Sequence, residues 1–202
     1  MIRTQMRRSF VLVVAAAMLF AAGCSSASAD DADTATVTGA GSFQAQVVLS
    51  APSSGGESVR LEVGFAAPDR WSVRTSEGQE SVTIGDASWW RPVGALEWES
   101  TDVAFDIAAV QLLIEGVDGL PLSEFDDSEP GSMIDGEATV VHSNRTSDAS
   151  TTVTVGTETG YVYAAKIERV DASGGGIVGE FSFSSYGDPV DITRPELVRD
   201  AS

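Results

Sequence analysis

Three parts of this sequence carry side chains that could do chemistry: the single cysteine Cys24, the single histidine His142, and an acidic stretch over residues 123–136. Nucleophilic catalysis needs a nucleophile and a base within hydrogen-bond reach. No Gly-x-Ser-x-Gly elbow accompanies the histidine. His142 falls in a predicted strand over residues 138–142, which indicates a surface strand residue. The sequence therefore predicts no catalytic residue, and we do not expect an enzyme.

The acidic stretch invites a comparison with calcium-binding loops. Asp126, Ser128, Gly131 and Glu137 fall at positions 1, 3, 6 and 12 of an EF-hand-like spacing. Position 5 is Pro130, which has no side-chain oxygen to offer. A single cysteine also excludes an intrachain disulfide and a zinc site built on several cysteines. We expect no metal site and no cofactor.

Composition narrows the class of protein further. The 202 residues include 30 Asp and Glu against 12 Lys and Arg, for a net charge of −18. A nucleic-acid partner is excluded, because neutralising phosphates requires clustered basic residues. Hydrophobic residues make up 43% of the chain, which is ordinary for a globular protein. The composition predicts one folded domain with short appendages.

The N-terminus has the pattern of an export signal. Arg3, Arg7 and Arg8 precede an uninterrupted apolar stretch over residues 10–22, and Ala-Ala-Gly then leads into Cys24. This junction resembles a bacterial lipobox. The resemblance implies cleavage before Cys24 and acylation of its thiol, which would anchor the protein at the extracytoplasmic face of the cell membrane. An ordinary cleaved signal peptide is the alternative, and the sequence leaves Sec or Tat export open.

Such cleavage defines the N-terminal parts of the chain. Residues 1–23 form the predicted lipoprotein signal peptide, and residues 24–41 form a small, polar, flexible tether after the lipidated cysteine. The remaining chain would carry nine basic and 30 acidic residues, a net charge of −21. Anionic lipid repels such a domain, so we expect the acyl chains to hold it at the membrane.

Apolar residues alternate with polar ones through most of the remaining chain. Phe43, Ala45, Val47 and Leu49 show this period of two, which places one face of a strand on a core. Similar runs, separated by Gly- and Pro-rich turns, predict about ten antiparallel strands, including a last short one over residues 190–193. We expect the domain to span residues 42–195, followed by a tail over residues 196–202.

One segment has helical periodicity instead. Residues 102–116 place Val103, Ile107, Val110 and Ile114 on one stripe, with further apolar residues beside it. An apolar arc this wide requires burial on most sides of the helix. The sequence predicts a mainly β fold in which a curved antiparallel sheet wraps one principal helix.

Three stretches within residues 42–195 resemble the LolA-like superfamily, and more narrowly its mycobacterial LppX/LprG-type lipoproteins. The first runs from Ile84-Gly85-Asp86 to Trp90 and on to Leu96-Glu97-Trp98. The second is Ile134 to Ala138, and the third is Phe181 to Pro195 with its Tyr-Gly-Asp-Pro turn and final Ile-x-x-Pro. The resemblance implies an incomplete barrel whose concave face holds helices.

The resemblance also implies a function, because several members of the superfamily carry acylated lipids or lipoproteins in their cavity. We expect a lipid or other apolar ligand between sheet and helix. The candidate cavity residues are Phe105, Ile107, Leu112, Trp71, Trp89, Trp90 and Trp98. Trp71 and Trp98 could equally be core, and one of the adjacent pair Trp89 and Trp90 must face outward.

A second function stays open at this point. The same fold with a filled interior would be an envelope interaction or sensor module without a ligand. Its acidic surface or loop 123–136 would then contact a protein partner, whose identity the sequence does not give. A cavity between sheet and helix would discriminate the two.

Overall fold

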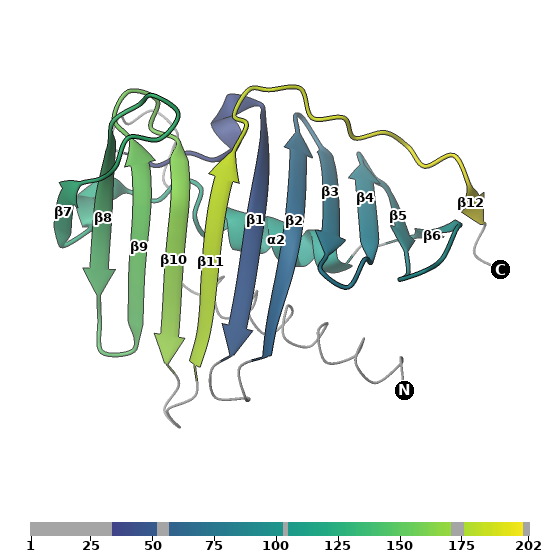
Figure 1. The fold of residues 1–202 in the computed structure, drawn as a ribbon, viewed down its shortest axis with the longest axis horizontal. Coiled ribbons are helices and arrows are strands. Elements are labelled where there is room, and N and C mark those ends of the chain that lie inside the picture. The colour runs from purple at the N-terminus through teal and green to yellow at the C-terminus, as the bar shows by residue number, and fades with distance from the viewer. Residues whose placement is uncertain (1–33, 52–56, 103–104, 171–175, 200–202) are drawn as a thin grey trace.

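A computed structural model describes residues 34–51, 57–102, 105–170 and 176–199. Within these described residues, twelve strands form one curved, open sheet, and a single α-helix lies across one of its faces (Figure 1). The predicted fold class, mainly β with one principal helix and an incomplete barrel, is confirmed. The predicted signal peptide and Cys24 lie outside the described residues.

The sheet consists of two antiparallel meanders joined at the middle. The first meander runs from β1 outward to β6, and the second returns from β7 to β11, which pairs with β1. A short final strand pairs parallel to β6. The strands are β1 Ser42–Ala51, β2 Glu57–Ala66, β3 Arg70–Thr75, β4 Glu80–Ile84, β5 Ala87–Arg91, β6 Trp98–Thr101, β7 Asp127–Pro130, β8 Thr139–Arg145, β9 Ala149–Gly156, β10 Val162–Val170, β11 Gly176–Ser184 and β12 Val198–Arg199.

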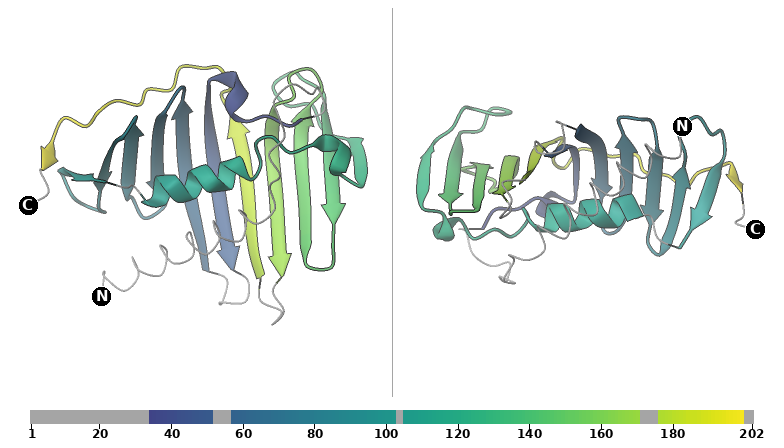
Figure 2. Two further views of the ribbon diagram at one scale, coloured as in Figure 1. Left: turned by 180° about the vertical axis from the view of Figure 1, so that it is seen from behind. Right: turned by 90° about the horizontal axis from the view of Figure 1, so that it is seen from below.

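The helix α2, Phe105–Glu115, connects the two meanders and crosses the sheet near its middle (Figure 2). Its predicted stripe is confirmed for Ile107, Val110 and Ile114, which are at most 2% exposed. Leu113 beside them is fully buried, whereas Leu112 is 42% exposed. The helix therefore packs directly on the sheet along one face and shows another face to solvent. We call the side of the sheet that carries α2 the helix face and the opposite side the outer face.

The main core lies on the helix face. Alternate residues of the central strands meet across the sheet, as in the row formed by Phe43, Phe65 and Trp71. The rings of Phe65 and Trp71 are 4.6 Å apart, and those of Phe43 and Phe65 are 5.2 Å apart. The predicted period of two thus produces one apolar face of the sheet. The apolar stripe of α2 packs against this face.

The folded part begins earlier than the sequence predicted. Residues 34–41, assigned above to the flexible tether, pack beside the segment that leaves α2, and Ala35 and Val37 are fully buried. The Asp118 carboxylate accepts hydrogen bonds from the Val37 backbone N–H and the Thr38 hydroxyl, both at 2.6 Å. A short 3-10 helix, η2 Thr38–Ala40, then leads into β1. The two buried apolar side chains in a polar stretch were too few to register as a periodic pattern.

The C-terminal part also differs from the prediction. Residues 185–197, which we call the strap, cross the outer face without forming the predicted strand over residues 190–193 (Figure 1). Ile192 is only 3% exposed, because the strap lies over a gap at Gly64. A Cβ built on Gly64 would come within 3.2 Å of the Val190 Cγ1 atom. The strap ends in β12, so the predicted tail over residues 196–202 includes part of the sheet.

The acidic stretch contributes an edge strand. Residues 127–130 form β7, which pairs with β8 at one end of the sheet. All four of its residues are exposed. The sequence predicts a loop here, because the polar residues lack the apolar alternation of a strand. Backbone pairing to β8 alone accounts for its conformation.

Candidate functional site

The seven predicted cavity residues do not share one face of the molecule. Strand alternation and register place Trp71 and Trp90 on the helix face, because Trp71 pairs with Thr83 and Trp90 with Ser81. The same alternation puts Trp89 and Trp98 on the outer face. The adjacent pair Trp89 and Trp90 thus splits as the sequence required, with Trp89 as the outward member.

The predicted residues on the helix face are mostly core. Trp71 is 8% exposed and Ile107 is 2% exposed, and both belong to the main core cluster. Leu112 lies on the solvent side of α2. Phe105 begins the helix, and its side chain lies outside the described residues. The interface directly beneath α2 is therefore filled by the helix's own side chains.

A hollow opens elsewhere on the helix face, which we call the helix-face hollow. It has a volume of about 640 Å³ and lies between strands β8 and β9, the turn over residues 156–160, and the short 3-10 helix η4, Leu122–Glu124. Leu122, Val140 and Val155 give it an apolar wall, and His142 joins them. Ligand sites of this size are typical of small-molecule binding proteins. None of the residues of this wall was among the predicted cavity residues, although Val140 and Val155 fall in two predicted strands.

His142 sits in the helix-face hollow in its neutral form at physiological pH. Its ring lies 5.9 Å from the Phe125 ring, edge to face. Partial burial lowers the pKa of His142 below its ordinary value of 6.5, because desolvation penalises the imidazolium. An uncharged ring beside Phe125 suits an apolar ligand better than an ionic one.

One rim of the hollow is held by a single carboxylate. Glu137 accepts hydrogen bonds from the backbone N–H groups of Glu158 at 2.7 Å and Thr159 at 2.8 Å, and from the Tyr163 hydroxyl at 2.9 Å. Burial alone would favour the protonated form, but these hydrogen bonds outweigh it and lower the pKa of Glu137. The turn at 156–160 is thereby fixed in place.

The turn that delivers Glu137 lies in the second of the three motif stretches. Asp135 and Gly136 both have positive φ, at 52° and 85°. Two residues of this kind make a tight turn that reverses the chain between Ile134 and Glu137, which form an isolated bridge. Asp and Gly tolerate this conformation. The motif therefore has a structural role as the support of the Glu137 carboxylate.

The third motif stretch closes the fold around Tyr186. The Tyr186 hydroxyl donates a hydrogen bond to the Val162 carbonyl, and its ring stacks on Tyr161 at 4.6 Å. Burial raises the pKa of Tyr186 well above its ordinary value. Gly187, with φ of 75°, then turns the chain so that the strap can begin.

The N-terminal segment enters the fold beside the helix-face hollow. Thr34 is one of the residues that line it. The next residues are held between Leu120 and Gly160, since the Ala35 N–H donates to the Leu120 carbonyl and the Thr36 N–H donates to the Gly160 carbonyl, each at 3.0 Å. Only nine residues stand between Thr34 and Cys24. The chain that leads to the predicted lipid anchor thus starts at the mouth of the hollow.

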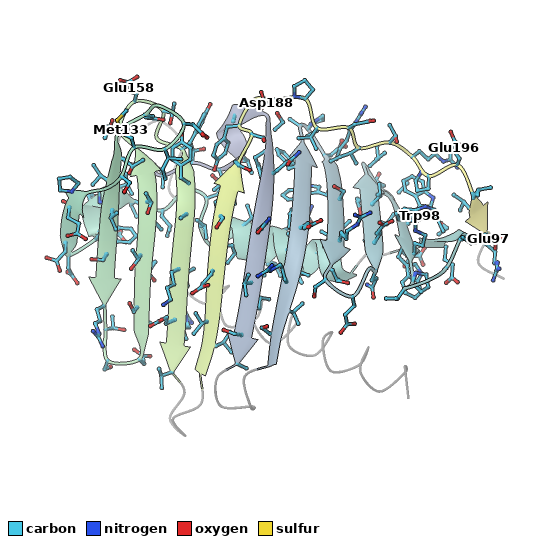
Figure 3. All side chains as sticks on the ribbon, viewed as in Figure 1. Glu97, Trp98, Met133, Glu158, Asp188 and Glu196 are labelled. Atoms are coloured by element: carbon cyan, nitrogen blue, oxygen red, sulfur yellow. The ribbon has the colours of Figure 1, made fainter. Side chains whose placement is uncertain are left out.

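A second, larger depression lies on the outer face, which we call the outer-face groove. Its volume is about 890 Å³, and strands β11, β1, β2, β3 and β4 form its floor. The strap residues 190–193 form one wall, and Trp98 stands at one end. Figure 3 looks onto this face, with Trp98 and Glu97 near the end of the sheet and the strap running from Asp188 to Glu196.

A row of polar and charged residues crosses the outer face, and its members from Gln46 to Glu80 line the groove. The register aligns Gln46, Glu62, Arg74, Glu80 and Arg91 on five neighbouring strands. Glu80 forms ion pairs with Arg74 and Arg91 and is only 14% exposed. Burial would raise the pKa of Glu80, but the hydrogen bonds from the two arginines outweigh it and lower the pKa below 4.5.

The two outward tryptophans are each covered by an arginine. The Arg91 guanidinium carbon lies 4.8 Å from the centre of the Trp98 ring, and that of Arg194 lies 5.5 Å from the Trp89 ring. Trp89 is 6% exposed, because the strap passes over it. Such cation–π contacts stabilise aromatic rings on a polar surface.

The described residues contain no group of three or more His, Cys, Asp or Glu side chains placed to hold a metal ion. None of the described helices is long and apolar enough to cross a membrane.

Comparisons with known proteins find similarity among solved structures. No family model and no curated protein matches the sequence. Among solved structures, LprF from Mycobacterium bovis is 18% identical, with a TM-score of 0.45 over 77% of this chain and 90% of that one. A LolA superfamily protein from Nitrosomonas europaea is 15% identical, with a TM-score of 0.35 over 77% of this chain and 91% of that one. This chain is similar to both structures, and the fold class itself rests on the strand order and the helix described above.

Proposed function

We propose that this protein is a lipid-anchored lipoprotein of the extracytoplasmic face of the cell membrane that binds a lipid or other apolar ligand on its helix face. The observation that carries the proposal is the helix-face hollow, whose apolar wall opens beside Thr34. A ligand there would lie close to the segment that leads to the anchor. The filled interface beneath α2 moves the expected site from the middle of the helix to the hollow near η4.

Binding in the hollow would rest on burial of apolar surface, which contributes about 25 cal/mol per Å². Leu122 and Val140 supply this surface, and neutral His142 adds no charge that an acyl chain would have to desolvate. The Glu137 carboxylate keeps the rim in shape through the turn at 156–160. No covalent step is part of this function, so we propose a binding protein and not an enzyme.

The anchor would be the acylated Cys24. The basic start, the apolar stretch and the small residues before the cysteine support this assignment. Ten peptide steps from Cys24 to Thr34 span at most about 35 Å. This reach would keep the hollow near the headgroups of the bilayer, where an amphiphile could enter or leave it.

Metabolic labelling tests the anchor. Cells that express the full chain receive an alkyne-tagged palmitate, and the purified protein is examined for the tag by fluorescence after coupling. We expect label on the native chain and none on the Cys24→Ser variant. Label that persists in the variant would contradict acylation at this residue.

Photo-crosslinking in cells tests the ligand. A benzophenone amino acid replaces Val140, whose side chain lines the hollow, and in a matched control replaces Val141, which points to the outer face of the same strand. We expect mass spectrometry to find an adduct of acyl-chain mass at position 140 and not at position 141. Equal lipid adducts at both positions would indicate bulk membrane and overturn the proposal.

A second function is favoured by one specific observation, which is the tight packing beneath α2. Ile107, Val110 and Leu113 leave a filled interior there, as expected of an envelope interaction or sensor module. Such a module would use exposed features, including the acidic loop 123–136. In the same crosslinking experiment, a protein adduct at position 140 without any lipid adduct would support this second function and contradict the first.

A further inference from the structure

We propose that the outer-face groove is a second binding site, separate from the helix-face hollow, and that it takes a neutral oligosaccharide. The groove lies on the opposite side of the sheet from α2, so a ligand there would not compete with one in the hollow. Its volume of about 890 Å³ falls within the range of ligand sites. This inference is independent of the function proposed above.

The floor of the groove offers side chains and little free backbone. Strands β11, β1, β2, β3 and β4 are paired continuously, so their N–H and C=O groups are used within the sheet. A polypeptide laid across these strands would find no free backbone groups on the floor to pair with its own. A ligand must therefore be recognised by the side chains that point outward.

Those side chains are mostly groups that both donate and accept hydrogen bonds. Gln44 and Gln46 from β1 and Ser182 and Ser184 from β11 are all exposed and line the groove. Amides and hydroxyls have this double capacity. The ligand group that matches it is another hydroxyl, since each hydroxyl can donate to an amide oxygen and accept from an amide N–H. A chain rich in hydroxyl groups fits this floor.

The charges in the groove argue against an anionic ligand. Glu62, Glu80 and Asp191 line it against a single basic residue, Arg74. Glu80 is already paired with Arg74 and Arg91. A phosphate or carboxylate would therefore meet unpaired acidic groups and a guanidinium that is already engaged. Carboxylates still accept hydrogen bonds from neutral hydroxyls.

The walls of the groove add apolar surface against which the apolar faces of sugar rings would pack. Val190 and Ile192 of the strap stand along one side, and Trp98 stands at the end of the sheet. Sugar rings carry apolar C–H faces next to their hydroxyl edges, and the amphipathic Trp ring is suited to such surfaces. The distance from β11 to β6 is six strand spacings, about 29 Å, which accommodates several sugar units in a row.

Titration with defined oligosaccharides tests the proposal. The full chain, held in detergent micelles, is titrated calorimetrically with the linear hexasaccharides of glucose and mannose in their α- and β-linked forms, and with hexalysine as the basic-peptide alternative. We expect at least one hexasaccharide to bind and hexalysine not to displace it. No binding of any hexasaccharide, or binding of hexalysine alone, would overturn the proposal.

Variants then locate the site. Gln46→Leu and Ser182→Leu, combined in one chain, remove hydrogen-bonding groups from the floor and should weaken binding about ten-fold or more. Thr152→Leu is the matched control, because Thr152 lies on the outer face in β9 and does not line the groove. Circular dichroism checks that both variants are folded. Equal affinity in the two chains would place the sugar elsewhere and contradict the assignment.

Discussion

The two faces of this one sheet have opposite chemistry. On the helix face, alternate residues such as Val47, Leu61 and Phe181 are at most 2% exposed and pack beneath α2. On the outer face, most of the residues between them are glutamines, serines and charged groups, and among the described residues the strap covers part of this face. Strand alternation thus gives each strand one set of side chains that packs in the main core and another set that lies on a polar surface.

The distribution of charge sharpens this contrast. Strand alternation places Arg60, Arg70, Arg74, Arg91, Arg145 and Lys166 on the outer face, and Arg194 lies over it on the strap. These are seven of the nine basic residues that follow Cys24. The outer face therefore carries both signs of charge, although the chain as a whole has a net charge of −18. Exposed acidic residues also lie at the edge strand β7, where Asp127 and Glu129 face solvent.

The largest expected effect lies on the helix face. Leu113→Ala should lower the free energy of unfolding by about 2–5 kcal/mol, because Leu113 is fully buried between α2 and the sheet. Leu112→Ala, one residue away on the solvent side, should change it by less than about 0.5 kcal/mol. Urea denaturation followed by circular dichroism measures both. Equal losses would mean that the helix is buried all round.

Substitutions in the strap test whether the outer face also has a stabilising element. Ile192→Ala should cost about 2 kcal/mol, near the low end for a buried isoleucine, because the strap is a single layer of chain. Leu197→Ala is the control, since Leu197 lies in the same strap and is 65% exposed. The same denaturation curves, with limited proteolysis of the C-terminus, measure the effect. If both variants behave alike, the strap rests on the sheet without contributing to stability.

The ion pairs of the outer face should have a smaller, pH-dependent effect. Glu80→Gln should lower stability at neutral pH by about 1 kcal/mol, because Arg74 and Arg91 lose their partner. The lowered pKa of Glu80 means that the unfolded chain takes up the proton first. The native pairs therefore stabilise the fold above pH 4.5, and this contribution is lost as the pH falls through the lowered pKa.

Denaturation of the native chain and of Glu80→Gln across this pH range checks the sign. The two chains should converge at low pH, where the native carboxyl is also neutral. Glu62→Gln, an exposed neighbour in the same row, should show a smaller difference at neutral pH. A constant gap between the native chain and Glu80→Gln at all pH values would show that the effect is steric and not ionic.

The smallest expected effect concerns His142 on the helix face. Its lowered pKa means that the unfolded chain is protonated before the folded one as the pH falls below 6.5. The folded state should therefore lose a little stability on acidification through this range, and His142→Leu should remove that loss. Thermal melts at about pH 7.5 and about pH 5.5 compare the two chains. An unchanged pH response in the variant would assign it to other groups.

Much of the fold could be predicted because it follows from local alternation. The strands with residues such as Phe43 and Val63 and the helix around Val110 were identified from their periodicity. Missed features had weak local signals. Ala35 and Val37 are two apolar residues in a polar stretch, and β7 has no apolar residue to alternate. The candidate site was predicted less well. Residue type alone assigned seven aromatic or apolar residues to one cavity, whereas the register puts Trp89 and Trp98 on the opposite face of the sheet from Trp71.

The sequence by itself determined the alternation, the helix and the lone cysteine at the end of an export signal, because these depend on residues close together in the chain. It also required that Trp89 and Trp90 point in opposite directions, since neighbouring strand residues always do. Only the tertiary structure decided which face each one joins, because the register of β4 and β5 sets this. It alone also placed the strap over Gly64 and the hollow beside Thr34, since both bring together segments that lie far apart in sequence.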